Sequence, residues 1–573
     1  MSFASKWFLI PLLILFISCS DSVEPDIIDT NGDNDINGED ITLTEQTIFE
    51  EDPNFGDITL TIDTDQEIVF EQNVTFNGTT VVFTGNAGGD VIANGDITVN
   101  GSVSWNYDDP RDVWRLEMVS DGDQTIRANQ DAWFLAYNID LEKSEGTLDL
   151  VNSDAPGYVL QAYNNFSADF SGSALFRDNG NTFVIGDDIE LDGDAGSYAL
   201  TGTLEHRVHN GNSDYEIVVP ELNNLFVHVR EDGNPRFRDE QGEGDDDDFT
   251  RDITINGDFI IDMVSIGDFE FNDVNLDIGG NFELTHHRPE EGQDNGDGIG
   301  EIDMDDAVVN IGGDFIVRLS KDQPDGDENI DVDDAVISVG GNLYIFAENN
   351  GEFDFDDSTF IVDGYAEITM ADGGIVDLDA SEVTIAGNLT IDINSVEDFE
   401  FGESVVTVGE NFFLTHHRPE GADGNGEIDV DDAIIDVGGD FVITLSKFEA
   451  DGDENIDMDD SEVTVRGNLY IFVFDNGEFD FDDSTIMVEG YAVMDIRSGG
   501  IIDFDESTVT FGDNLTFFID ETGEVDTDDI EEAAIPVARN LVVNLLEHDD
   551  DSLVDVTRFN VAGDTTINPN FSE

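Results

Sequence analysis

Residues 342–364, NLYIFAENNGEFDFDDSTFIVDG, contain the pattern that decides the fold of this 573-residue chain. Apolar and polar residues alternate in three short runs, which are separated by Asn-Asn-Gly at 349–351 and by Asp-Asp at 356–357. Alternation with a period of two is typical of β-strands, and the interruptions consist of turn-forming residues. We therefore predict three strands in 23 residues. The side chains predicted to point inward are Leu343, Ile345, Phe353, Phe355, Ser358, Phe360 and Val362.

The same pattern returns along the chain, most often after 23 residues. Each copy begins with Asn, Asp or Tyr, at positions 258, 281, 314, 342, 365, 388, 411, 440, 468, 491, 514, 540 and 564. A fixed period of this size predicts a solenoid in which coils stack on one another. Three strands per coil and no convincing amphipathic helix predict an all-β, right-handed parallel β-helix. We expect left-handed backbone geometry at the first Asn or Asp of each copy, because these residues tolerate it.

A block of five coils is duplicated, since residues 258–387 resemble residues 388–513. FELTHHRPE at 282–290 recurs as FFLTHHRPE at 412–420, and DGDENI at 325–330 recurs at 451–456. We divide the chain into a signal peptide (1–18), an acidic tether (19–40), an N-terminal part (41–250) and a regular β-helix of acidic repeats (251–573). The N-terminal part consists either of irregular coils of the same rod or of a separate β capping domain.

The N-terminus has the layout of a bacterial lipoprotein signal. Lys6 precedes an apolar run over residues 7–17, and Ser18 then precedes Cys19, the only cysteine in the chain. The run is too short to span a bilayer and matches a signal peptide. We predict lipidation of Cys19, which would make the protein an outer membrane lipoprotein exposed at the cell surface. A generic signal peptide with an incidental cysteine is the alternative.

The charge is extreme, with 20 Lys and Arg against 134 Asp and Glu, a net charge of −114. Such a chain repels nucleic acids and anionic lipid surfaces, so we expect no nucleic-acid partner, and no motif indicates a nucleotide. Because 39% of residues are hydrophobic and 41 are Phe, a large core is nevertheless available. The self-repulsion must be offset by salt, by divalent cations or by raised carboxylate pKa values.

The repeat SxVxVxGNLxI followed by GxIDxD resembles the repeats of bacterial surface β-helix proteins, including adhesins of the filamentous-haemagglutinin type. The resemblance covers about residues 250–568. It implies surface display and adhesion, and it assigns no functional residue. We therefore expect a structural or adhesive role, with glycans or other surface proteins as candidate partners besides the membrane that holds the lipid at Cys19.

Each coil also carries an acidic corner of the form apolar-Asp-apolar-Asp-Asp, such as IDMDDA at 302–307 and FDFDDS at 353–358. Stacking of coils would place these carboxylates in ladders at about 5 Å spacing, and opposed like charges destabilise a sheet. Ca²⁺ prefers such oxygen ligands, and several loops have spacings similar to an EF-hand loop. A solvated acidic face that keeps the rod soluble is the alternative. The candidate calcium ligands are Asp29, Asn31, Asp33, Asp40, Asp325, Asp327, Asp331, Asp334, Asp423, Asn425, Asp429, Asp432, Asp451, Asp453, Asp457 and Asp460.

Two further features bear on function. The pairs His286-His287 and His416-His417 lie five coils apart and cannot share one ion, so we expect them to be structural. The competing function class is a carbohydrate-active enzyme or glycan-binding protein, with its site in residues 41–250 or in the loops 288–300 and 418–427. We assign no catalytic residue. The N-terminal aromatic residues that could stack on sugars are Trp105, Tyr107, Trp114, Trp133 and Tyr137.

Overall fold

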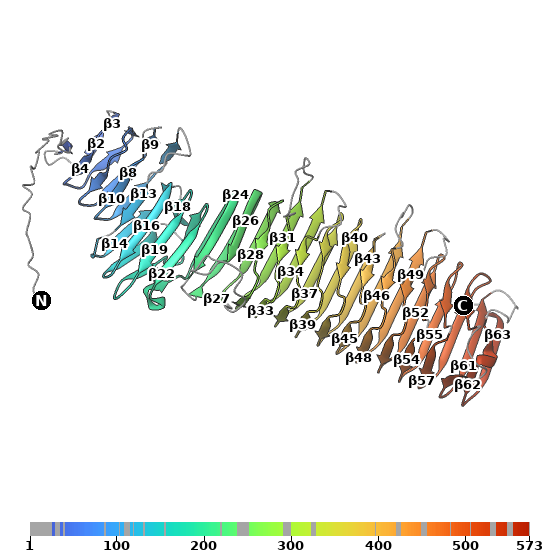
Figure 1. Cartoon of the computed structure of the whole chain (residues 1–573). Helices are drawn as coiled ribbons and strands as arrows, with labels where there is room; N and C mark the ends of the chain where they lie inside the picture. The colour runs from blue at the N-terminus through green and yellow to red at the C-terminus, as the bar shows by residue number, and fades with distance from the viewer. Residues whose placement is uncertain are drawn as a thin grey trace, which may run out of the picture.

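The structure, a computed structural model, is an elongated rod of stacked β-coils with its first and last strands at opposite ends (Figure 1). Every strand pairing in the described residues is parallel, and their only helices are the short 3₁₀ turns η1 (Ala195–Ser197) and η2 (Val556–Arg558). The predicted parallel β-helix is therefore confirmed. The residues that the structure describes are 26–28, 35–37, 40–84, 88–101, 103–107, 115–118, 120–129, 132–153, 156–217, 221–237, 251–289, 300–322, 328–395, 397–419, 426–448, 455–481, 483–504, 506–527, 534–546 and 554–571.

The coil at 342–364 contains β37 (Leu343–Glu348), β38 (Glu352–Phe353) and β39 (Thr359–Val362). The next coil contains β40 (Ala366–Ala371), β41 (Ile375–Asp377) and β42 (Glu382–Ile385). Leu343 pairs with Ala366 and Phe360 pairs with Val383, so equivalent positions are 23 residues apart. Three strands per coil, as predicted, alternate with two turns and a corner.

The strands of the regular coils form three series. The first strands are β28 (Phe259–Ser265), β31 (Phe282–Arg288), β34 (Phe315–Lys321), β37, β40, β43 (Leu389–Asn394), β46 (Phe412–Arg418), β49 (Phe441–Lys447), β52 (Leu469–Phe474), β55 (Ala492–Ile496), β58 (Leu515–Ile519) and β61 (Leu541–Leu546). The second strands are β29 (Phe269–Glu270), β32 (Ile302–Asp303), β35 (Ile330–Asp331), β38, β41, β44 (Phe399–Glu400), β47 (Ile428–Asp429), β50 (Ile456–Asp457), β53 (Glu478–Phe479), β56 (Ile501–Asp503) and β59 (Glu524–Asp526). The third strands are β27 (Arg251–Ile255), β30 (Val274–Ile278), β33 (Val308–Ile311), β36 (Val336–Val339), β39, β42, β45 (Val405–Val408), β48 (Ile434–Val437), β51 (Glu462–Val465), β54 (Thr485–Val488), β57 (Thr508–Phe511) and β60 (Ile535–Val537).

The third strands form a 14-stranded sheet with β25 (Glu221–Leu222) and β62 (Phe559–Val561). The first and second strands belong to one 37-stranded sheet, because the long strands β24 (Thr203–Ile217) and β26 (Asn224–Phe237) extend across both series. The same sheet continues into the N-terminal coils, which include β15 (Phe134–Ala136) and β18 (Tyr158–Ala162). There, separate 8-stranded and 4-stranded sheets complete the coils.

The core fills the inside of the rod, because alternate side chains of every strand point inward. The inward positions predicted for residues 342–364 are confirmed, and each of those seven side chains is at most 3% exposed. Ring stacks extend between coils: Phe259, Phe282 and Phe315 stack in succession with centroids 5.0 Å apart. Parallel offset stacking of this kind adds to the burial of apolar surface.

The expectation of left-handed geometry at the first residue of each coil is wrong. Asn388 and Asn411 are not among the residues with positive φ, which instead include the last acids of the acidic corners, for example Asp334 with φ 51°, and turn residues after the first strands, for example Asn349 with φ 49°. The first residues serve as hydrogen-bond acceptors between coils. Asn388 Oδ1 accepts from the backbone N–H of Asn411 at 3.0 Å, and Asn411 Oδ1 accepts from that of Asp440 at 2.9 Å.

The described residues include no helix of the length and apolar character needed to span a bilayer.

Candidate carboxylate clusters

Acidic side chains form two columns along the outside of the second strands. Each second strand ends on an inward apolar residue followed by an outward acid, and the parallel register stacks these acids: Asp303 pairs with Asp331, and Asp377 with Glu400. The first column contains Glu270, Asp303, Asp331, Asp354, Asp377, Glu400, Asp429, Asp457, Asp480, Asp503 and Asp526. The second column lies two residues further on and contains Asp305, Asp333, Asp356, Asp379, Asp431 and Asp459. The predicted ladder of carboxylates is therefore present.

The local fold follows from the sequence of the corner. In the segment Ile330–Asp334, Ile330 and Val332 are fully buried, so Asp331 and Asp333, which alternate with them, point out of the rod. Asp334 then adopts a positive φ, a conformation that Asp tolerates better than most residues, and turns the chain into the third strand. This geometry holds Asp331 and Asp333 on one edge of the coil and directs Asp334 away from them.

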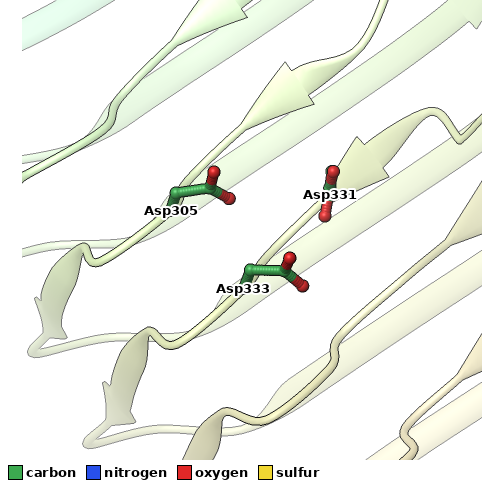
Figure 2. Close-up of side chains that lie close together, drawn as sticks. All are labelled: Asp305, Asp331 and Asp333. Carbon is green, nitrogen blue, oxygen red and sulfur yellow. The ribbon is translucent and has the colours of Figure 1, made fainter.

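Four groups of three carboxylates have oxygen atoms that all lie within 4.8 Å of one another. Figure 2 shows one of them, in which Asp305 from one coil lies beside Asp331 and Asp333 from the next. The four clusters are Asp305–Asp331–Asp333, Asp354–Asp356–Asp377, Asp377–Asp379–Glu400 and Asp431–Asp457–Asp459. The second and third share Asp377, so five acids from three coils form one continuous group.

Burial and mutual repulsion raise the carboxyl pKa values in these clusters. Partial burial is the largest cause at Asp354, and the neighbouring charges of Asp356 and Asp377 add to it, so its pKa rises to about 8. The same two causes raise the pKa of Asp305 and Glu400 to about 7. The pKa rises to about 6 at Asp331, Asp356 and Asp379. At neutral pH some carboxyl groups of the columns therefore remain protonated, and those that are ionised repel their neighbours strongly.

The arrangement can bind a cation. One oxygen atom each of Asp305, Asp354, Asp356 and Asp379 is buried without a hydrogen-bond partner. Hard divalent cations such as Ca²⁺ take six to eight oxygen ligands, from carboxylates, backbone carbonyls and water. Each cluster offers carboxylates from two neighbouring coils, so a bound ion would join coils that otherwise repel.

The predicted calcium ligands lie in different environments, and only some of them belong to the carboxylate columns. Asp331 and Asp457 belong to clusters, and Asp429 lies in the first column, where its Oδ1 accepts from the N–H of Asp431 at 3.1 Å. Asp334, Asp432 and Asp460 are exposed corner residues with positive φ. Asp40 is exposed and accepts from the N–H of Thr59 at 2.8 Å. The candidates Asp29, Asn31, Asp33, Asp325, Asp327, Asp423, Asn425, Asp451 and Asp453 lie outside the described residues, as does Cys19.

Most of the clustered acids were absent from the predicted set. They are Asp305, Asp333, Asp354, Asp356, Asp377, Asp379, Glu400, Asp431 and Asp459. The prediction selected residues by their spacing inside one loop, as in an EF-hand. The signal that identifies the clusters is the 23-residue period, because stacking brings together acids that are one coil apart in the sequence.

The histidine pairs occupy the interior and the surface of the rod in both copies. His286 and His416 are fully buried, and the Nδ1 atom of each lies 3.0 Å from the backbone oxygen of Asn329 or Asn455. Desolvation lowers the pKa of each to about 4, so they are neutral at pH 7. His287 Nδ1 lies 2.9 Å from Ser320 Oγ on the neighbouring strand. The two pairs pack in separate coils.

The aromatic residues of the N-terminal part are divided between core and surface. Trp105 packs on Phe134, and its Nε1 donates to the backbone oxygen of Trp133 at 3.1 Å. Trp133 is 41% exposed. Tyr137 stacks on the exposed Tyr163 with centroids 5.7 Å apart. Trp114 and the side chain of Tyr107 lie outside the described residues.

Arg318 and Lys321, a close pair of basic residues on β34 that an enzymatic site could use, make structural contacts instead. Lys321 is buried and its Nζ lies 2.8 Å from Glu352 Oε2, while Arg318 lies over the ring of Phe346.

Comparison of the chain with protein-family models, with curated proteins and with solved structures gives no match.

Proposed function

We propose that this chain is a structural or adhesive rod at a bacterial surface, and that Ca²⁺ bound between coils at the carboxylate columns stiffens it. In this proposal lipidated Cys19 anchors the rod to the outer membrane and residues 19–40 form the tether. The observation that carries the proposal is the retention of the columns in both copies of the duplicated block.

Because the block is duplicated, the residue at each position of one copy can be compared with its equivalent in the other, which shows which positions have been retained. All nine acids of the columns in the first copy are acids in the second: Glu270/Glu400, Asp303/Asp429, Asp305/Asp431, Asp331/Asp457, Asp333/Asp459, Asp354/Asp480, Asp356/Asp482, Asp377/Asp503 and Asp379/Asp505. Most outward positions of the third strands have changed instead, as in Asn275/Val405, Asp277/Thr407, Asn310/Asp436, Val336/Glu462, Ile361/Met487 and Glu382/Thr508, although Thr359/Thr485 and Thr384/Thr510 are retained. A requirement for solubility alone would allow acids to move freely over the surface. The retention therefore favours a role that depends on position.

Calcium accounts for that dependence on position. Opposed like charges in neighbouring strands destabilise a sheet, and a divalent cation between them replaces repulsion by ligation. Because the ligands come from neighbouring coils, the ion stabilises the folded rod only. Such binding adds RT ln(1 + [L]/Kd) per site, which is about 2.7 kcal/mol at a hundredfold excess over Kd.

The test is thermal unfolding and calorimetric titration of residues 20–573 with calcium. We expect millimolar CaCl₂ to raise the unfolding midpoint well above that in NaCl of matched ionic strength. Asp354→Asn/Asp356→Asn/Asp377→Asn should lower the calcium stoichiometry and raise the midpoint in chelator, because it removes both ligands and repulsion.

The matched control removes three exposed acids of the same region that lie outside the columns. Asp363→Asn/Asp372→Asn/Glu382→Gln changes the net charge equally and should leave the calcium stoichiometry unchanged. Equal effects of Ca²⁺ and NaCl at matched ionic strength, or equal losses in both triple variants, would show that the columns are a screened acidic surface.

A further inference from the structure

The exposed large hydrophobic side chains of the described residues are sorted by chemistry between two faces of the rod. The aliphatic ones, Ile361, Val405, Ile434 and Met487, lie on third strands. The aromatic ones lie in or next to strands of the 37-stranded sheet, and they are Trp133, Tyr158, Tyr163, Tyr365, Phe413, Phe448 and Tyr491. In the regular coils the exposed aromatic side chains, Tyr365, Phe413, Phe448 and Tyr491, therefore lie in or directly beside first strands.

Three aromatic side chains on this face form a compact group, which we name the first shelf: Tyr344, Phe346 and Tyr365. Tyr344 and Phe346 point outward from β37 with ring centroids 6.5 Å apart and planes 9° from parallel. Tyr365 precedes β40 and meets Tyr344 edge to face at 5.6 Å, with their hydroxyl groups hydrogen-bonded. Tyr365 is 39% exposed.

The duplicated block holds a second shelf, Tyr470, Phe472 and Tyr491. Tyr470 and Tyr491 repeat the edge-to-face contact at 5.7 Å and the hydrogen bond between hydroxyl groups. The shelves are on the same face, five coils apart, which corresponds to about 24 Å at the spacing of parallel strands. Both are therefore open to one extended ligand.

The shelves have been retained while their surroundings changed. All three aromatic residues are identical in the two copies. Many other outward positions of the first strands differ, as in Ile260/Thr390, Glu283/Phe413, Arg318/Thr444, Glu348/Phe474, Glu367/Val493 and Ala371/Arg497, while Asp262/Asp392, Thr285/Thr415, His287/His417 and Ser320/Ser446 are retained. Tyr365 and Tyr491 also occupy the first position of a coil, where most coils have the Asn or Asp that accepts a hydrogen bond from the next coil. Tyr365 and Tyr491 have no side-chain oxygen placed to accept this hydrogen bond, so each copy has retained Tyr in place of a residue that would tie two coils together.

The charge of this face restricts the ligand. The outward positions of β49, β52 and β55 around the second shelf carry one acid, Asp495, which is paired with Arg497 at 2.6 Å. These strands at the second shelf are thus neutral, and those at the first shelf (β34, β37 and β40) carry Glu348 and Glu367 against Arg318, so both patches have little charge on a chain of net charge −114. Anionic polymers and a second copy of the chain are repelled by the rest of the rod. A neutral polymer with apolar faces and hydroxyl edges fits both the rings and the tyrosine hydroxyls.

We propose that the two shelves bind one strand of a neutral polysaccharide. The apolar faces of the sugar rings pack on the exposed aromatic rings, which removes both surfaces from water. The hydroxyl groups of the sugar exchange hydrogen bonds with the Tyr hydroxyls at the edge of each shelf. Because the shelves are separate, a strand long enough to reach both binds with avidity that neither shelf has alone.

The test measures binding of soluble laminarin, xyloglucan, arabinoxylan and mannan, with alginate as the anionic comparison, to residues 20–573 in millimolar CaCl₂. Each shelf is removed with residues that other coils have at the same register positions: Tyr344→Thr/Phe346→Thr/Tyr365→Asn, and Tyr470→Thr/Phe472→Thr/Tyr491→Asn. We expect at least one neutral polymer to bind and alginate not to bind. Loss of one shelf should weaken binding at least tenfold, and loss of both should abolish it.

The control, Ile434→Thr/Met487→Thr, removes exposed apolar side chains from the third-strand face and should leave binding unchanged. The calcium-dependent unfolding midpoint of each shelf variant should equal that of the parent chain, which separates this proposal from the calcium proposal. The shelf proposal is overturned if no neutral polymer binds, if alginate binds equally, or if the control weakens binding as much as the shelf variants do.

Discussion

At the scale of single residues, the column of Asn and Asp at the start of each coil ties neighbouring coils together. Asn411 accepts from the N–H of Asp440 at 2.9 Å, and its own Nδ2 donates to Asn388 Oδ1 at 3.0 Å. Asn411→Ala leaves the Asp440 N–H without this partner, which costs about 1 kcal/mol. We expect hydrogen exchange at the Asp440 amide to become about fivefold faster, a change measurable by mass spectrometry.

The control for this prediction is Asn411→Asp, which keeps the acceptor oxygen. Asp440 already fulfils this role in the next coil, where its Oδ1 accepts from the N–H of Asn468 at 2.8 Å. Exchange at Asp440 should therefore stay close to that of the parent chain. Equal acceleration in both variants would mean that the side-chain amide, rather than the acceptor, holds the coils in place.

At the scale of the element, a column of buried serines closes the corner before the third strands. Ser381 Oγ donates to the backbone oxygen of Phe355 at 2.7 Å and accepts from the N–H of Ser358 at 3.2 Å. Ser381→Ala leaves both backbone groups without their partner, at a cost of about 2 kcal/mol. Alanine fits the site sterically, since Ala335 occupies the same position one coil before Ser358. We expect a lower urea midpoint, with Ser338→Ala on the outer face of β36 changing stability by less than about 0.5 kcal/mol.

The elements were predictable from the sequence because period-two alternation and the 23-residue repeat are local signals. Phe353 and Phe355 point inward as the alternation requires, and both are at most 1% exposed. Contacts between coils were harder to predict from the sequence. The choice between a left-handed backbone at Asn388 and a hydrogen bond from its side chain depends on the residue one coil away, and both are common for Asn. For the same reason, the partners of Asp331 are found by stacking and not by the spacing within its own loop.

At the scale of the whole molecule, the carboxylate columns and the buried histidines give stability a dependence on pH. A carboxyl group whose folded pKa is raised binds more protons in the folded state than in the unfolded state, so stability falls as pH rises from the unfolded to the folded pKa. Asp354, with a pKa of about 8, extends this loss to pH 8. His286 and His416, with pKa values lowered from 6.5 to about 4, act in the opposite direction, because stability falls as pH drops below 6.5. Between about pH 6.5 and 8 the carboxyl groups act alone.

In chelator, the unfolding midpoint should therefore fall from pH 6.5 to pH 8, and Asp354→Asn should reduce the slope because it removes the group with the pKa of about 8. Calcium competes with protons for the same oxygens, so its stabilising effect should grow over the same interval. The measurement is a grid of melting curves at four pH values with chelator or CaCl₂. A midpoint that is constant from pH 6.5 to 8 in chelator would show that the column carboxylates are already ionised and well hydrated, so that repulsion between the coils would give cations no reason to bind there.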